Sequence, residues 1–322
     1  AAGGGVCETG RRERNRAEQR MGDAAREQLG GRRINNSTTI EGKSGYGLEL
    51  ETELKQLRVV QRLARTERLS LIPTFLGAHE VPPEYRPRRE AYVRSVIEDM
   101  LPAVAREGLA MACDVFCEPG VFSVSEARAV LAAARGHGLA TKLHADELEG
   151  CGGAELAAEL GALSADHLAG VSDAGVRALA STSTVAVLLP ATMSFLGKQR
   201  QAPARRLIEA GAAIALASDF NPGSSPTLGL PLVMSLAVSQ LGLRHSEAVM
   251  AVTVNAAAAL GLAHDRGQIA PGFAADLVAC AVGDWREVAY WVGANLVTDV
   301  WTAGFACPRP VSPVSLGFHV EA

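Results

Sequence analysis

The sequence has few aromatic residues and no long apolar run. Aromatic residues make up 5% of the 322 residues. No apolar stretch approaches the roughly 18 uninterrupted residues that a membrane-spanning helix needs. The first residues are rich in Ala and Gly and then basic, without the apolar stretch that a secretory signal peptide contains. We therefore expect a protein that has neither a membrane segment nor a signal peptide.

Cysteine is also scarce, and charge of either sign is not in large excess. The six cysteines are spread along the chain and none forms a CxxC pair. Disulfide scaffolds are short and rich in cysteine, so we expect reduced thiols in a cytoplasmic protein, with Cys113 and Cys117 in the core. The formal net charge of −4 favours neither nucleic acid nor an anionic membrane as a partner.

The chain divides into segments of different composition. Residues 1–36 are basic and polar, as in GRRERNRAEQR, which indicates a solvated helix or a disordered arm. From residue 37, short β-rich runs alternate with helical stretches rich in Ala and Leu, which is typical of βα units around a parallel sheet. We predict a barrel over residues 37–262. Residues 263–322 would hold a helix and the remnant of a small β domain.

Seven strands are predicted within the barrel region. A (β/α)8 barrel has eight strands and about 250 residues, so the pattern predicts an α/β fold of the TIM-barrel type whose first strand is missing. The missing unit would precede residue 37, and the first residue is Ala rather than Met. The predicted strands are 37–44, 70–79, 113–118, 140–147, 163–168, 185–190 and 213–220.

Polar residues follow five of these strands, at the edge where parallel barrels form their active sites. His144 follows the apolar-leaning run TKL and could bind a metal ion, or it could be a core histidine bonded to a carbonyl. Asp219 ends the run IALASD, where a carboxylate is costly unless it is paired, hydrogen-bonded or metal-bound. The alternative for Asp219 is a helix cap or a turn.

Three further residues at strand ends are candidates. His167, in SADHL, could handle protons or form a structural hydrogen bond with Asp166. Glu147 could orient a water molecule and move its proton, or be a solvated loop residue. Tyr46 lies between two glycines in KSGYGL, where the backbone can approach a ligand, although a plain glycine turn has the same pattern.

Together these motifs resemble one known family. KSGYGLELETELKQLRV, TFLGAHEVPPEY, DVFCE, KLHADEL, LSADHL and SDFNPGSSPT are similar, in order and spacing, to motifs of imidazolonepropionases. VNAAAALGL followed by GQIAPGFAADLV resembles the C-terminal signature of the amidohydrolase superfamily. The resemblance covers residues from about 37 to about 305.

The resemblance implies a metal-dependent hydrolase of histidine degradation that converts 4-imidazolone-5-propanoate to N-formimidoyl-L-glutamate. It implies one divalent or trivalent metal ion, zinc or iron, bound by His144 and Asp219, and proton transfer by Glu147, His167 or Asp219. In an intact site the metal and His79 would stabilise the oxyanion. The partners implied are the small-molecule substrate and a second copy in a homodimer, without nucleic acid or membrane. The implied substrate contacts are Tyr46, His79, Glu147, Asn221, Gly223 and Ser224.

The sequence departs from the family in its metal ligands. The family also uses a His-x-His pair on its first strand and an arginine that contacts the substrate. This sequence contains no His-x-His pair, and no histidine precedes His79. A truncated gene model with a misread segment would explain the difference.

That departure leaves three functional readings open. Two protein ligands are fewer than the three of a catalytic zinc site, so we predict weak metal binding and little turnover. The alternatives to an imidazolonepropionase are another cyclic-amide hydrolase or aminohydrolase of the superfamily, and a non-catalytic fragment.

Overall fold

The computed structural model describes residues 6–34, 36–67 and 69–307. Its centre is a parallel sheet whose seven strands lie side by side in sequence order, as the sequence predicts. Every strand overlaps its predicted range, so the seven strands and the α/β barrel type are confirmed. The strands are β1 (Thr39–Lys43), β2 (Ser70–Ala78), β3 (Ala112–Cys117), β4 (Ala140–Ala145), β5 (Ser164–His167), β6 (Val185–Leu188) and β7 (Ile214–Leu216).

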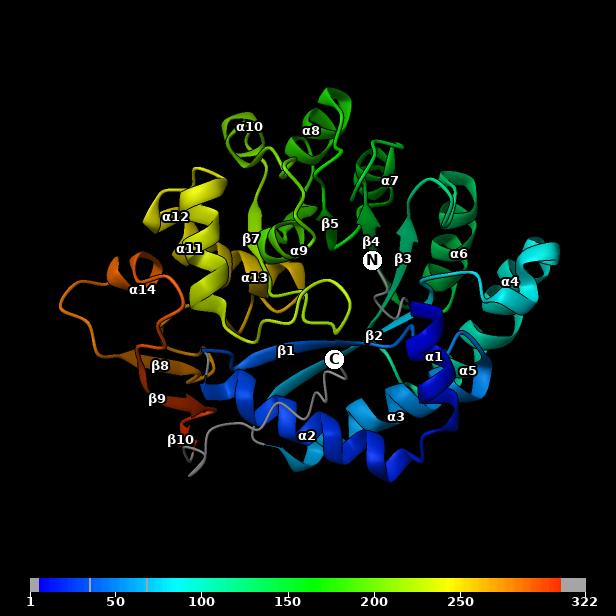
Figure 1. The fold of residues 1–322 in the computed structure, drawn as a ribbon, viewed down its shortest axis with the longest axis horizontal. Coiled ribbons are helices and arrows are strands. Elements are labelled where there is room, and N and C mark those ends of the chain that lie inside the picture. The colour runs from blue at the N-terminus through cyan, green and yellow to red at the C-terminus, as the bar shows by residue number, and fades with distance from the viewer. Residues whose placement is uncertain (1–5, 35, 68, 308–322) are drawn as a thin grey trace.

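Helices connect the strands and cover the outer side of the curled sheet (Figure 1). The helix after β3 shows how the sequence sets its start: Ser123 and Glu126 form the capping box that this Ser-x-x-Glu pattern favours. The helices are α3 (Leu50–Thr66), η1 (Pro83–Arg88), α4 (Arg89–Ser95), η2 (Val96–Met100), α5 (Leu101–Glu107), α6 (Val124–Gly136), α7 (Gly153–Leu160), α8 (Asp173–Ala180), α9 (Pro190–Phe195), α10 (Ala204–Ala210), α11 (Leu230–Gln240), α12 (His245–Val252), α13 (Val254–Ala259) and α14 (Glu287–Tyr290).

The sheet does not close into a barrel within the described residues. Strands β1 and β7 each pair with one neighbour, and Figure 1 shows the opening between them. Helix α13 contacts β6 and β7 beside this opening. There the side-chain amide of Asn255 donates to the carbonyl of Ile214 at 2.8 Å, which satisfies one acceptor of the edge strand.

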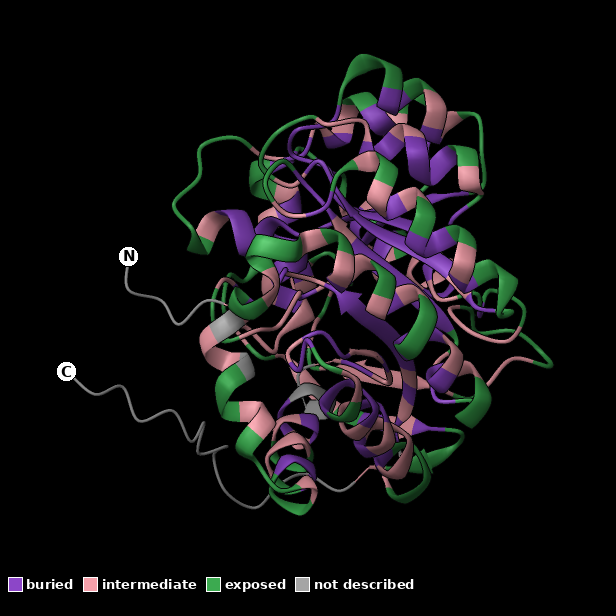
Figure 2. Ribbon diagram, turned by 90° about the vertical axis from the view of Figure 1, so that its right-hand side faces the viewer, coloured by how far each residue is buried: buried purple, intermediate pink, exposed green. Residues whose placement is uncertain are grey.

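The main core lies between the sheet and the outer helices, and Figure 2 shows the strands as largely buried. Side chains alternate across a strand, so neighbouring residues serve different sides. Leu143 belongs to this core, whereas His144, the next residue of β4, lines the cavity on the inner side. The alternation thus places core residues on the outer side of β4 and cavity residues on its inner side.

Residues 6–34, which the sequence indicates as a solvated helix or a disordered arm, form two helices. Helix α1 (Val6–Asn15) is fixed at its end by Arg14, whose Nε donates to the carbonyl of Gly47 at 2.7 Å. Helix α2 (Glu18–Ile34) contacts α3, and Met21 packs in a small buried cluster there. Residues 1–5 of this segment lie outside the described residues.

The C-terminal segment contains the small β structure that the sequence predicts. Strands β8 (Leu277–Cys280), β9 (Val297–Thr302) and β10 (Phe305–Ala306) form an antiparallel sheet. Residues 308–322 of the segment lie outside the described residues. Among the described helices, none has the length and apolar character needed to cross a membrane.

Candidate active site

All the predicted site residues line one cavity of about 590 Å³ on the inner side of the sheet. They come from the ends of different strands and from the loops that follow them, so the curl of the sheet brings distant parts of the sequence together. This is the edge at which parallel barrels hold their active sites. The residues are Tyr46, His79, His144, Glu147, His167, Asp219, Asn221, Gly223 and Ser224.

Four rings form a row in this cavity. The ring centroids of Tyr46 and His79 are 5.4 Å apart, those of His79 and His144 are 6.0 Å apart, and those of His144 and His167 are 5.2 Å apart. Tyr46 and His79 follow strands β1 and β2, His144 lies one residue before the end of β4, and His167 ends β5. Three imidazoles and a phenol therefore face the same space.

His79 is held as a neutral imidazole. Its Nδ1 lies 2.9 Å from the carbonyl oxygen of Gly45, so this nitrogen carries the hydrogen and donates it. Burial, with a smaller contribution from His144, lowers the pKa of His79 to about 4. The second ring nitrogen, Nε2, then acts as a hydrogen-bond acceptor at neutral pH.

The loop that carries Tyr46 is shaped by a buried carboxylate. Glu53, in the first turn of α3, accepts the backbone N–H groups of Gly45, Gly47 and Leu48 at 2.8 to 2.9 Å. Gly45 has a φ of 102°, which favours glycine, and a Cβ there would meet the Leu76 carbonyl oxygen at 2.7 Å. Burial, with a smaller effect from Asp219, raises the pKa of Tyr46 to about 12, so its phenol stays neutral.

The loop that carries Glu147 is also held by a carboxylate. Glu118 accepts the N–H groups of Glu147, Leu148 and Glu149 at 2.8 to 3.2 Å. Oε2 of Glu147 lies 3.6 Å from Nε2 of His167, whose other ring nitrogen is buried without a hydrogen bond. Glu147 and His167 therefore form a pair that faces the cavity.

Asp146 shapes the rest of the same loop. Its carboxylate accepts four successive N–H groups, at 2.8 to 3.2 Å, where the chain enters α7. Its φ of 51° shows that the chain turns sharply at this residue. Asp146 therefore has a structural role, and Glu147 is left as the carboxylate that the turn presents to the cavity.

Asp219 and the loop after it form a compact turn. Oδ2 of Asp219 accepts the hydroxyl of Thr192 at 2.7 Å, and its carbonyl accepts the side-chain amide of Asn221 at 2.9 Å. The carbonyl oxygen of that amide accepts the N–H groups of Gly223 and Ser224. Asn221 is thus used by the loop itself as well as facing the cavity.

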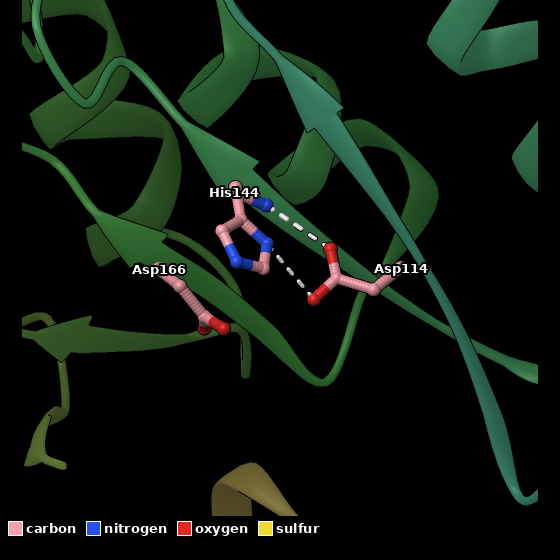
Figure 3. Close-up of side chains that lie close together, drawn as sticks. All are labelled: Asp114, His144 and Asp166. Carbon is pink, nitrogen blue, oxygen red and sulfur yellow. Dashed lines mark hydrogen bonds and ion pairs between the residues drawn. The ribbon is translucent and has the colours of Figure 1, made fainter. Parts of the chain in front are cut away.

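His144 lies beside a cluster of buried charges. Oδ2 of Asp114 is 3.0 Å from Nδ1 of His144 (Figure 3, which draws Asp114, His144 and Asp166). The ammonium of Lys43 bonds to both Asp114 and Asp166. Burial lowers the pKa of His144, but Asp114 outweighs this effect and raises it overall. The pKa of Lys43 is likewise raised, because the carboxylates outweigh its burial.

The metal ligands expected from the sequence are only partly brought together. Among the described residues, the ligand atoms of Asp114, His144 and Asp166 lie within 4.8 Å of one another, and they are the one group of three or more that does so. Asp219 lines the same cavity but does not belong to this group. An imidazole and a carboxylate are ligand types that suit a transition-metal ion, and that His144 and Asp219 share one ion stays a prediction from the sequence.

The strand-end reasoning missed three carboxylates that organise the cavity. Asp114 and Glu118 lie in and directly after the apolar run CDVFC, and Glu53 lies in the first turn of a helix. An acid inside an apolar strand is costly unless it is paired, and that signal was available for Asp114. The partners of Glu53 and Glu118 are backbone amides, which no side-chain pattern reveals.

Comparison with known proteins finds relatives over most of the chain. A model of the amidohydrolase family matches residues 65–305. An imidazolonepropionase from Geobacillus kaustophilus is 48% identical over 303 residues, which are 94% of this chain and 71% of that protein. An imidazolonepropionase from Symbiobacterium thermophilum is 48% identical over 305 residues, which are 94% of this chain and 72% of that protein.

Solved structures of low sequence identity share the fold. An adenosine deaminase from Xanthomonas campestris with bound zinc has a TM-score of 0.69 at 18% identity, over 90% of this chain and 70% of that chain. A 5-methylcytosine deaminase from Klebsiella pneumoniae has a TM-score of 0.75 at 14% identity, over 96% of this chain and 79% of that chain. At such identities the likeness supports the fold alone.

Proposed function

The chain belongs to the imidazolonepropionase family of amidohydrolases, and from that premise we propose that it hydrolyses 4-imidazolone-5-propanoate to N-formimidoyl-L-glutamate. This reaction opens a cyclic amide in histidine degradation. The observation that carries the proposal is that the nine residues which the family resemblance assigns to the site line a single cavity. Another cyclic-amide hydrolase or aminohydrolase is not favoured, because the relatives at 48% identity are imidazolonepropionases.

We propose that His144 and Asp219 would hold a zinc or iron ion. When bound, such an ion would lower the pKa of a bound water to about 7 and polarise the substrate carbonyl. The family resemblance assigns these two residues of the chain as ligands, whereas a catalytic zinc site uses three. A homodimer, a cytoplasmic location and the absence of a nucleic-acid partner stay predictions from the sequence.

The neutral state of His79 changes the role that we assign to it. Because its Nδ1–H is donated to Gly45, its Nε2 offers a lone pair and has no hydrogen to give to an oxyanion. We therefore assign His79 the role of accepting an N–H of the substrate ring, in place of the oxyanion contact expected from the sequence. Tyr46, as a neutral phenol, can donate its hydroxyl hydrogen in the same part of the cavity.

Glu147 is the residue that we assign to proton transfer. Its loop is fixed by Glu118, and its carboxylate faces His167 at 3.6 Å. One oxygen of Asp219, by contrast, already accepts the hydroxyl of Thr192. In the proposed step a water molecule adds to the ring carbonyl and Glu147 takes its proton. Glu147 then gives the proton to the ring nitrogen as the C–N bond breaks.

A binding experiment separates the proposed substrate from other rings. We expect 4-imidazolone-5-propanoate to bind the metal-free chain in calorimetry, and adenine and cytosine not to bind. His79→Gln would weaken binding by about 10-fold, which corresponds to the roughly 1.4 kcal/mol that the loss of one hydrogen bond can cost. His137→Gln, at an exposed position, is the matched control. Tighter binding of a purine or pyrimidine would contradict the proposed substrate.

Metal binding is tested separately. Because this chain supplies two ligands, we expect zinc to bind weakly in calorimetry, and tight stoichiometric binding would overturn that expectation. With excess zinc, Glu147→Gln would reduce any residual hydrolysis by about 10²- to 10⁴-fold, the range for loss of a general base. Glu149→Gln changes an exposed carboxylate of the same loop and would leave the rate unchanged.

A further inference from the structure

A lysine crosses the inner side of the sheet to reach two buried carboxylates. Nζ of Lys43, on β1, lies 2.5 Å from Oδ2 of Asp114 on β3 and 2.8 Å from Oδ2 of Asp166 on β5. Neither β3 nor β5 pairs with β1, so the lysine spans the concave face instead of joining neighbours. Both carboxylates are buried, and Asp114 is 0% exposed. This arrangement fixes the position of the Asp114 carboxylate.

The carboxylate of Asp114 in turn contacts His144 at two places. Oδ1 accepts the backbone N–H of His144 at 3.1 Å, and Oδ2 lies 3.0 Å from Nδ1 of its ring (Figure 3). The ring contact is an ion-pair distance whose angle is not that of a hydrogen bond, so a small rotation of the ring would complete the bond. One side chain thus meets both the backbone and the ring of the residue to which we assign metal binding. Asp166 shares the same ammonium but makes no hydrogen bond or ion pair with His144 among the described contacts.

We propose that Asp114, held by Lys43, is a positioning residue that fixes the ring orientation and the tautomer of His144. A carboxylate beside Nδ1 favours hydrogen on that nitrogen, which leaves the lone pair of Nε2 for the cavity. Histidine ligands of metals commonly have their second nitrogen paired in this way. The inference rests on the proposed function only for the identity of what Nε2 binds.

The charges support a fixed carboxylate at this place. Burial alone would raise the pKa of Asp114, but His144 and Lys43 outweigh burial and hold it well below its usual range. Asp114 therefore stays ionised and acts only as an acceptor. The short hydroxyl contact from Ser164 to Asp166, at 2.6 Å, keeps the second carboxylate of the lysine in place as well.

A matched pair of variants tests the proposal in the metal-free chain. Asp114→Asn and Asp166→Asn each remove one of the three carboxylates near Lys43, the third being Glu41 at 3.6 Å, but of the pair only Asp114 contacts His144. We expect ¹⁵N NMR of histidine-labelled protein, assigned with His144→Gln and recorded at increasing pH until the His144 signals stop shifting, to show the Nδ1–H tautomer of the neutral ring in the wild type. Asp114→Asn would lose that dominant signal, and Asp166→Asn would keep it. Equal behaviour of the two variants, or an Nε2–H tautomer in the wild type, would overturn the proposal.

The lysine is tested by its own matched pair. Lys43→Met frees Asp114, so we expect more than one His144 resonance, from more than one ring orientation. Lys142→Met removes another buried ammonium of the cavity, one that donates to the carbonyl of Ala259, and would leave a single resonance. Multiple resonances in both variants, or in neither, would contradict the role of Lys43.

A third variant keeps the test valid if a single change prevents folding. The double variant Lys43→Met with Asp114→Asn removes both members of the ion pair and leaves neither charge of that pair alone. It would give the same loss of the Nδ1–H signal as Asp114→Asn, and a wild-type signal would refute the proposal. These spectra need neither metal nor substrate. They therefore test the positioning of His144 by Asp114 separately from the proposed hydrolysis, and one hypothesis can fail while the other holds.

Discussion

At the scale of single residues, burial decides which cavity groups carry charge. His79 is the clearest case, because its pKa in the folded chain is about 4 against an ordinary value of 6.5. Between these values the unfolded chain binds a proton that the folded chain does not, so stability is lost as the pH falls through this window. Above pH 6.5 the contribution is fully present.

Replacing His79 tests this linkage. We expect the wild type to lose up to about 3 kcal/mol of unfolding free energy from this residue between pH 7 and pH 4. His79→Gln, which can still donate to the carbonyl of Gly45, would lack this part of the pH dependence. Urea unfolding of both proteins at several pH values measures the difference. An identical dependence would show that His79 does not titrate as its burial indicates.

Burial also determines the order in which the cysteine thiols should react with an alkylating reagent. Cys113 is 0% exposed, and burial raises the pKa of its thiol, whereas Cys151 is half-buried and a contact with Cys117 lowers the pKa of its thiol. We expect iodoacetamide to alkylate Cys151 well before Cys113, because the thiolate is the reacting form. Peptide mass spectrometry over time measures both rates. Faster alkylation of Cys113 would contradict the burial order.

At this scale the sequence predicts positions better than partners. The strand-end rule places Tyr46, His144 and Asp219 at the cavity, because a parallel sheet presents the ends of its strands at one edge. It does not reveal that Asp114 pairs with Lys43, since the two are 71 residues apart and the pairing depends on the curl of the sheet.

At the scale of elements, buried carboxylates take the place of regular hydrogen bonding in the cavity loops. Glu53 holds the loop after β1, Glu118 holds the loop after β4, and Asp146 holds the entry to α7. Each accepts three or four backbone N–H groups that would otherwise be buried without partners. The loops are therefore ordered by acids that come from the scaffold.

Glu53→Gln should weaken the fold. The substitution replaces one acceptor oxygen by an NH₂ group, which then faces backbone N–H donors of Gly45 or Gly47, and leaving such donors unpaired costs about 1–3 kcal/mol. Glu51→Gln, at an exposed position of the same helix, would change the unfolding free energy by at most about 0.5 kcal/mol. Urea denaturation of the two variants gives the comparison, and equal stabilities would contradict the assigned role.

The elements differ in how far the sequence predicts them. The seven strands follow from their apolar runs and from the glycine and proline that bound them. Residues 6–34 have few apolar anchors, so their packing against α3 could not be predicted. It depends on a few side chains such as Met21 and Leu29, whose cluster forms only in the tertiary structure.

At the scale of the whole molecule, the open sheet has two edge strands whose backbone groups are less protected than those of the central strands. On β1 and β7, alternate N–H groups face the opening, where no described strand pairs with them. We expect these amides to exchange with deuterium much faster than those of β4, which pairs on both sides. Hydrogen exchange read by NMR measures the contrast. Equal protection of β1, β7 and β4 would show that another segment covers the opening.

The ion pairs of Lys43 hold the edge strand β1 in place. A terminal strand ordinarily frays first, yet β1 cannot leave without stripping this cation from two acids anchored two and four strands away. Separating the lysine from these acids leaves a buried carboxylate without its partner, which costs on the order of 3–5 kcal/mol. Lys43 thus ties β1 to the central strands of the sheet. If β1 detached, Asp114 would lose its lysine and the rings of the histidine row would lose their fixed positions, so we expect the two events to occur together.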